Sequence, residues 1–100
     1  MTDFTFTAPL WRWPGESPWH FVALPEELTD DVRMLAGPRK AFGSVRVEVT
    51  VGATTWRTSL FPDGGRDTYL LPVKQAVRRA EGLGEGDPVA VTLRLVGADE

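Results

Sequence analysis

Residues 44–51 read SVRVEVTV, and this stretch decides the fold class because valine occupies every second position. Charged or hydroxyl side chains lie between the valines, so the two sides of the stretch differ in polarity. Such period-two alternation of β-branched residues is typical of a strand that is buried on one face only. Residues 88–96 repeat the pattern, with valine or leucine at alternate positions. The sequence therefore predicts a β-rich protein.

Further strands are predicted on either side of this stretch. Residues 54–61 follow it across Gly52-Ala53, and a two-residue loop that starts with glycine suits a type II′ hairpin turn. Residues 4–10 also alternate, and Pro9 places that strand at a sheet edge or gives it a bulge, because proline cannot donate to a ladder. Two shorter strands, each entered from a turn rich in proline and glycine, are predicted over residues 19–24 and 68–71.

Two helices are predicted between the strands. The first covers residues 26–36 and ends at Gly37-Pro38. Its apolar face comprises Leu28, Val32 and Leu35. The second begins near residue 73 and ends before Gly82, which can serve as its C-terminal cap. Its apolar face comprises Val73, Ala76, Val77 and Ala80.

The predicted segments occur twice in the same order, as residues 4–51 and 54–96. Each half holds a Trp-Arg pair, a Pro/Gly turn, a strand that ends in Leu-Pro, a helix and an alternating strand. This order predicts an internal duplication of strand-strand-helix-strand units. Two such units wrap their sheets into one barrel with two short helices and cover each other's edges. An unrepeated α+β sandwich is the alternative.

Three segments resemble a known family. Residues 19–25 read WHFVALP, residues 58–62 read TSLFP before Gly64-Gly65, and residues 84–89 read GEGDPV. Together, over about residues 4–96, the chain resembles the bacterial DUF1905 family, a domain of unknown function. The resemblance implies a double-split β-barrel, an architecture that swapped dimers of AbrB-type transcription factors also form. It implies no catalytic residues.

Composition limits the class of protein further. The 100 residues fit one domain, residues 1–100, and 42% of them are hydrophobic. The chain has no cysteine, which excludes disulfides and thiolate metal sites. A net charge of −3 argues against binding to nucleic acid. The sequence shows no signal peptide and no apolar run long enough to span a membrane, so we expect a cytoplasmic monomer that needs no cofactor or metal.

No catalytic set is readable in the sequence. His20 is the only histidine, and no acid or nucleophile stands at a readable spacing from it. Acidic residues cluster at 26–31, where they suit the N-terminal end of a helix rather than a metal. The glycine-rich residues 82–87 leave a helix and enter a strand, which is the reverse of a phosphate-binding loop.

Tryptophan and basic residues are the candidate ligand-binding groups. Leu10-Trp11-Arg12-Trp13 places two indoles on the face opposite Leu10, unless Pro9 shifts the register. Trp and Arg dominate binding hot spots, and a cation near the start of the second helix suits an anion. The candidate ligand-binding residues are Trp11, Trp13, Trp56, Arg57 and Lys74. Core packing of the indoles and solvation of the cations are the plainer interpretations.

Three function classes remain open. The leading hypothesis is a non-enzymatic binding module for a small ligand or a protein partner. A DNA-binding regulator follows only from analogy with AbrB-type barrels, and the acidic net charge opposes it. An enzyme would need an arrangement such as Lys74 with Asp63 or Asp67, converging in a pocket.

Overall fold

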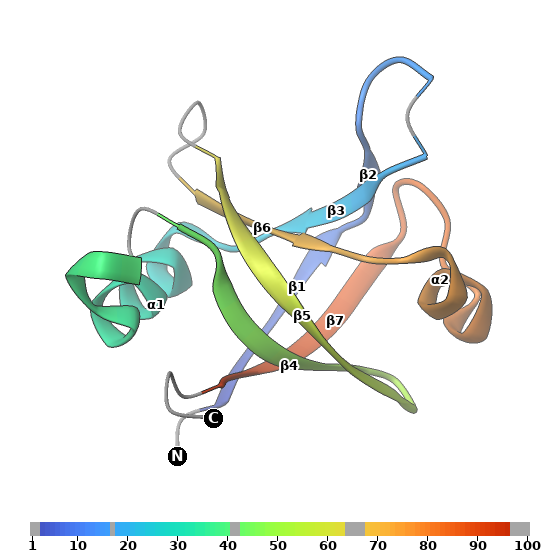
Figure 1. Ribbon diagram of the computed structural model, residues 1–100. Helices are drawn as coiled ribbons and strands as arrows, with labels where there is room; N and C mark the ends of the chain where they lie inside the picture. Colours follow the sequence, from blue (N-terminus) through green and yellow to red (C-terminus); the bar gives the residue numbers. More distant parts are fainter. Residues whose placement is uncertain (1–2, 17, 41–42, 64–67, 97–100) are drawn as a thin grey trace.

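Strands β4 (Val45–Val51) and β7 (Pro88–Leu95) are paired interior strands of an antiparallel sheet that curls into a half-barrel (Figure 1). The structure is a computed structural model that describes residues 3–16, 18–40, 43–63 and 68–96, with the side chains of residues 36–40 excepted. Within that part of the chain the sheet has seven strands in the order β1-β7-β4-β5-β6-β3-β2. The remaining strands are β1 (Asp3–Pro9), β2 (Trp11–Arg12), β3 (His20–Ala23), β5 (Thr54–Asp63) and β6 (Thr68–Pro72).

The predicted alternation sets which face of the sheet is buried. All four valines of β4 are buried, and the residues between them are exposed or half-buried. Strand β7 follows the same pattern, so both strands point their branched side chains into the curl. The buried core comprises Phe4, Leu10, Val22, Leu24, Val32, Val45, Val47, Val49, Val51, Leu60, Tyr69, Leu71, Val73, Val77, Val89, Val91 and Leu93.

Two helices lie at opposite sides of the half-barrel, and each differs from its prediction (Figure 1). Helix α1 spans Glu26–Lys40 and continues through Gly37-Pro38, where the sequence predicts its end. The prediction is wrong because a proline near the end of a helix has a helical φ and removes only one backbone donor. Leu35 is exposed, and Thr29 is buried in the face that packs on the sheet.

Helix α2 spans Gln75–Glu81 and ends at Gly82, whose φ of 64° confirms the predicted left-handed cap. Only Val77 of this helix is buried, so the predicted face is wrong for Ala76 and Ala80, which are exposed. Of the predicted positions, Val77 and Val73, which lies just before the helix, reach the core. No described helix is long and apolar enough to cross a membrane.

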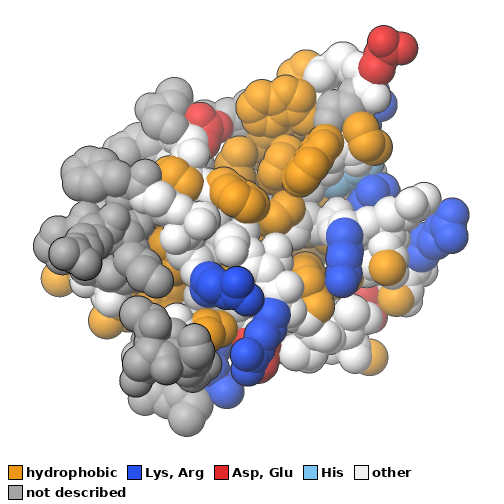
Figure 2. Space-filling model, viewed as in Figure 1, with side chains coloured by type: hydrophobic (Ala, Val, Ile, Leu, Met, Phe, Trp, Pro, Cys, Tyr) orange, Lys and Arg blue, Asp and Glu red, His pale blue; other side chains and the backbone are white. Residues whose placement is uncertain are grey.

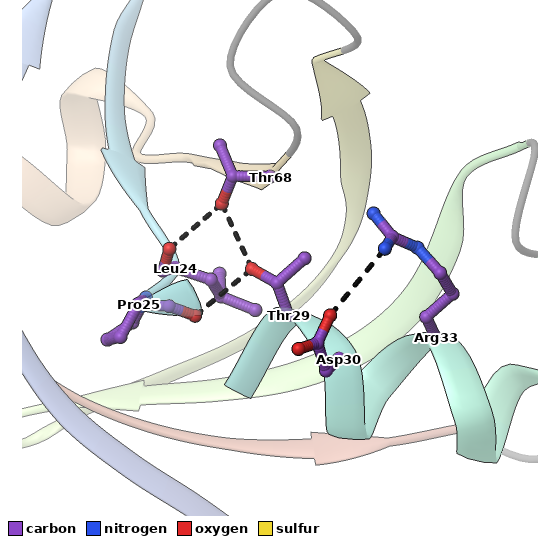
Figure 3. A network of polar contacts seen from close by, with 6 residues as sticks. All are labelled: Leu24, Pro25, Thr29, Asp30, Arg33 and Thr68. Carbon is purple, nitrogen blue, oxygen red and sulfur yellow. Dashed lines mark hydrogen bonds and ion pairs between the residues drawn. The ribbon is translucent and has the colours of Figure 1, made fainter. Parts of the chain in front are cut away.

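A hydroxyl network fixes the start of α1 against β6 (Figure 3). The Thr68 hydroxyl donates to the Leu24 carbonyl at 2.8 Å, and it lies 3.0 Å from the Thr29 hydroxyl. Thr29 Oγ1 in turn lies 3.1 Å from the Pro25 carbonyl, to which it donates. These contacts satisfy the buried hydroxyl of Thr29 and hold the helix to the strand.

A second contact joins α2 to the turn between β4 and β5. The Thr54 hydroxyl donates to Glu81 Oε2 at 2.6 Å, next to Gly52. Gly52 has a φ of 58°, which confirms that the predicted two-residue hairpin needs glycine at its first position. A Cβ at Gly52 would overlap the Glu81 carboxylate, so this glycine also makes room for the helix.

The half-barrel confirms a β-rich fold with two helices, and the finer features stay predictions. Residues 4–51 and 54–96 contribute to the same sheet. Closure of the barrel and internal duplication are not shown by these pairings alone. The predicted turn at residues 62–65 lies partly outside the described residues, although Asp63 pairs with Thr68 on the next strand.

Candidate functional site

The outer face of the sheet carries three rows of side chains at its β5-β6-β3-β2 end. Backbone pairing sets the rows: Trp11 pairs with Phe21, and Phe21 pairs with Pro72. The Trp13 amide donates to the Trp19 carbonyl at 2.9 Å, and the Val73 amide donates to the His20 carbonyl at 2.9 Å. The rows are Trp13, Trp19 and Lys74; Trp11, Phe21 and Pro72; and Ala23, Leu70 and Phe61.

The aromatic rings of these rows contact one another around Phe21. The Phe21 ring centre lies 5.4 Å from that of Trp11 and 5.8 Å from that of Trp13. The ring of Trp19 stacks on Phe21 at 6.0 Å with an interplanar angle of 13°. The ring of Trp13 meets Phe21 edge-on at 70°. The planes of Trp13 and Trp19, which are backbone neighbours across the sheet, are therefore steeply inclined to each other, and we call this pair of rings the indole corner.

This group is separate from the core. Phe21 and Leu70 are buried, yet neither belongs to the cluster of residues that fills the half-barrel. Their sequence neighbours Val22 and Leu71 do belong to it, since successive side chains of a strand point to opposite faces. We name Trp11, Trp13, Trp19, Phe21, Phe61 and Leu70 the outer aromatic surface.

Large rings of the outer aromatic surface face solvent. The exposed fractions are 45% for Trp13, 57% for Trp19 and 44% for Phe61. Figure 2 shows hydrophobic side chains gathered over β2, β3 and β6, with Lys and Arg side chains beside them. A full aromatic side chain covers about 150–250 Å², so these three rings expose on the order of 300 Å² of apolar area. An apolar patch of that size on a monomer often has a function.

Two cations without an ion pair flank the outer aromatic surface. Lys74 occupies the same row as Trp19, precedes α2 and makes no ion pair with any described residue. Arg46 is exposed beside Ser59, which is two positions before Phe61 on β5, and it also has no ion pair within the described chain. Both positions present positive charge to the surface.

The structure brings together three of the five predicted site residues. Trp11, Trp13 and Lys74 lie in adjacent rows of the outer face. Arg57 lies on the same face but farther along β5, where its Nε is 3.6 Å from Glu48 Oε2. Trp56 points the other way: it pairs with the buried Val49 and packs against the core.

The sequence prediction left Trp19, Phe21 and Phe61 out of the site. Trp19 and Phe21 alternate on one strand, and this spacing was the available signal that they share a face. Lys74 and Trp19 are 55 positions apart in the sequence, and the strand register that makes them neighbours cannot be read from a single sequence.

Outside this end the outer face is polar. Thr5 pairs with Thr92, Thr92 with Thr50, and Thr50 with Thr55, so four strands share a row of hydroxyls. A hollow of about 370 Å³ beside this row is lined by Thr5, Phe6, Thr7, Thr50, Gly52, Ala90, Val91 and Thr92. No predicted site residue lines it. Cross-strand threonine pairs stabilise sheets, and that role accounts for the row.

A charged row lies next to the threonines. Arg94 Nε donates to Asp3 Oδ1 at 3.1 Å, and this bond raises the pKa of Arg94 above its usual value. Arg94 also pairs in register with Glu48, the partner of Arg57. The charges in this row alternate in sign across four strands, so they stabilise the sheet and leave little net charge for a ligand.

Groups for acid–base or metal chemistry do not converge in the described part of the chain. No cluster of three or more His, Cys, Asp or Glu side chains suited to a metal occurs there. His20 Nδ1 donates to the Pro18 carbonyl at 2.8 Å, which ties the ring to its own turn. Asp63 pairs with Thr68 at the start of β6 and Lys74 follows its end, so the two lie about 20 Å apart along the strand, and Asp67 lies outside the described residues.

Two comparisons with known proteins complete the description. A family model described as "Domain of unknown function (DUF1905)" matches residues 6–93, which is most of the chain. A comparison with curated proteins found no match.

Proposed function

The chain belongs to the DUF1905 family, and on that premise we propose that it is a non-enzymatic binding module that holds its ligand on the outer aromatic surface. The family description names no function, so the proposal rests on the site. The observation that carries it is a pair of half-exposed indoles, Trp13 and Trp19, over the buried Phe21 and beside Lys74.

The exposed rings have an energetic cost that a ligand would remove. Burial of apolar area contributes roughly 25 cal/mol per Å², so about 300 Å² corresponds to about 7 kcal/mol of transfer free energy. The fold already buries its core on the other face of the same strands. Packing within the chain accounts for the buried Phe21 but leaves the outer faces of Trp13 and Trp19 exposed, and a bound partner would cover them.

The neighbouring residues supply orientation as well as area. The corner between Trp13 and Trp19 restricts how an apolar group can approach. Lys74 adds a directional positive charge at the same end of the surface. An apolar floor with a small number of placed polar groups is typical of binding sites. Trp56 and Arg57 lie outside this arrangement and have no part in the proposal.

The other two function classes have less support. Arg57 is paired with Glu48 and the net charge is −3, so the outer face offers few free cations for DNA phosphates. Lys74 and Asp63 lie too far apart to act on one substrate. Bacterial origin, a cytoplasmic location and the monomeric state stay predictions from the sequence.

We also infer that the half-barrel arose by duplication and closes as a double-split barrel. Strands β3 and β6 pair with each other, as do β4 and β7, and in each pair one strand comes from each predicted half. Strands β1 and β3 contact each other across the remaining gap. An experimental structure tests this: residues 4–51 should superimpose on 54–96 with both helices matched, and helices that fall on different strands would refute it.

A thermal-shift screen tests the binding function. The full chain is screened against metabolites and short peptides, and each hit is repeated with Trp13→Ala and Trp19→Ala. Arg79→Glu is the control, since Arg79 is exposed on α2 and lies outside the surface. We expect hits that the tryptophan variants lose and the control keeps. Hits that all variants keep equally, or a screen with no hits, would contradict the proposal.

A further inference from the structure

The outer aromatic surface is too small for a second folded domain and suits a short segment of chain. A stable protein–protein interface buries roughly 800 Å² on each partner, somewhat more than half of it apolar, whereas the exposed rings offer on the order of 300 Å² of apolar area. From the row of Trp19 to the row of Ala23 the surface extends over four residues of strand, or about 13 Å. About four residues of polyproline II chain, at ~3.1 Å each, cover that length.

Ring geometry favours a rigid, convex apolar group. Trp19 lies nearly parallel to Phe21, whereas Trp13 stands edge-on to the same ring. A flat base or sugar stacks on one ring, whereas a convex apolar group can contact both of the inclined indoles. A proline ring fits such a corner, and aromatic-lined grooves bind polyproline II segments with little loss of chain entropy.

Charge beside the exposed indoles favours an acidic segment over a basic one. Lys74 borders the indole corner, whereas Arg46 and Asp63 both lie near Phe61, Arg46 beside Ser59 on β4 and Asp63 two positions along β5. Neither cation forms an ion pair with a described residue. The cation beside the indoles suits a carboxylate, and the cations near this surface are too few for the string of phosphates that a nucleic acid presents.

From these three observations we propose that the outer aromatic surface binds an acidic, proline-containing peptide segment in the polyproline II conformation. The segment lays a proline between Trp13 and Trp19 and places a carboxylate at Lys74. This inference rests on the proposed function, and it adds the chemistry of the ligand.

The test is a titration of the full chain with synthetic peptides, followed by tryptophan fluorescence. The probe is the heptapeptide Glu-Pro-Pro-Glu-Pro-Pro-Glu with blocked ends. Three matched probes are Glu-Gly-Gly-Glu-Gly-Gly-Glu, Lys-Pro-Pro-Lys-Pro-Pro-Lys and an oligothymidylate of similar length. They remove the proline rings, reverse the charge and supply phosphates, in that order.

We expect the acidic proline peptide to bind about tenfold or more tightly than each matched probe. Trp19→Ala and Lys74→Glu should each weaken binding by about tenfold, whereas Arg79→Glu, an equal change of charge on α2, should change it by less than about twofold. Unfolding curves of the variants show whether each remains folded. Lys74→Arg should restore most of the affinity that Lys74→Glu loses.

Other results overturn the inference. Equal binding of the glycine peptide would remove the role of proline, and tighter binding of oligothymidylate would favour nucleic acid. If no peptide binds while metabolites in the thermal-shift screen still require Trp13 and Trp19, the peptide inference fails and the binding module stands. If neither peptide nor metabolite depends on these indoles, both proposals fail.

Discussion

Lys74 lies across the sheet from Trp19, on the same outer face. The hydrogen bond between the Val73 amide and the His20 carbonyl extends the pairing of β3 with β6 by one residue and so sets this neighbour relation. The two residues come from different predicted halves of the chain. Their proximity places a cation beside the exposed indoles, and the proposed ligand chemistry depends on it.

Removing an indole from the outer face should cost far less stability than removing one from the core side. Trp19→Ala loses a half-exposed ring that stacks on Phe21, so we expect a decrease of about 1 kcal/mol in the free energy of unfolding. Trp56→Ala leaves a gap against the core and should cost about 3 kcal/mol. Urea unfolding followed by circular dichroism measures both. Equal losses would mean that Trp19 belongs to the core.

Gly52→Ala should destabilise the turn between β4 and β5 by about 2 kcal/mol. The φ of 58° strains any L side chain, and the new Cβ would displace the Glu81 carboxylate that accepts from Thr54. In a Glu81→Ala background the same substitution should cost only the backbone strain, about 1 kcal/mol. The difference is read from the two unfolding midpoints. Identical costs in both backgrounds would show that the carboxylate does not matter.

The hydroxyls of Thr29 and Thr68 should be coupled energetically. Each Thr→Val substitution removes one member of the network that joins α1 to β6 and should cost about 1 kcal/mol. Because both hydroxyls share one contact, the double variant should cost less than the two single changes together. A double-mutant cycle on unfolding free energies checks this. Strict additivity would indicate that the 3.0 Å contact carries no interaction energy.

Tyr69→Phe should leave stability unchanged or raise it by about 1 kcal/mol. The Tyr69 side chain is 1% exposed, and its hydroxyl has no hydrogen-bond partner among the described residues. A buried hydroxyl without a partner carries a desolvation cost that phenylalanine does not have. Thermal unfolding of the Tyr69→Phe variant and of the unchanged chain at the same pH measures the difference in stability. A clear loss of stability would reveal a partner for the hydroxyl.

Alternation of residue type predicted the sheet well, because a strand with one buried face needs an apolar side chain at every second position. The valines of 44–51 and the pattern of 88–96 became the interior strands β4 and β7. Helix boundaries were less predictable. Gly37-Pro38 does not end α1, since a single lost donor near a helix end is tolerated once the rest of the helix is packed.

The candidate site was predicted only in part, because its members meet through strand order rather than through spacing. Trp11 and Trp13 share a face because they are two residues apart on one extended segment, and this spacing is visible in the sequence. Trp56 was misplaced in that group: it faces Val49 and the core, because β5 turns its even-numbered side chains inward. The residues next to a tryptophan in the sequence do not show whether its indole lies on the core side or on the outer side of the sheet. That assignment needs the neighbouring strand.

The proposed function is tested most directly by the indole N–H signals of the four tryptophans in a ¹⁵N-labelled sample of the full chain. Assigned by single Trp→Phe substitutions, these signals are followed while pools of metabolites and the four probes described above are added. The account predicts that a ligand shifts the signals of Trp13 and Trp19 and leaves that of Trp56 in place. Ligands that move Trp56 first, or that leave Trp13 and Trp19 unmoved throughout, would contradict it.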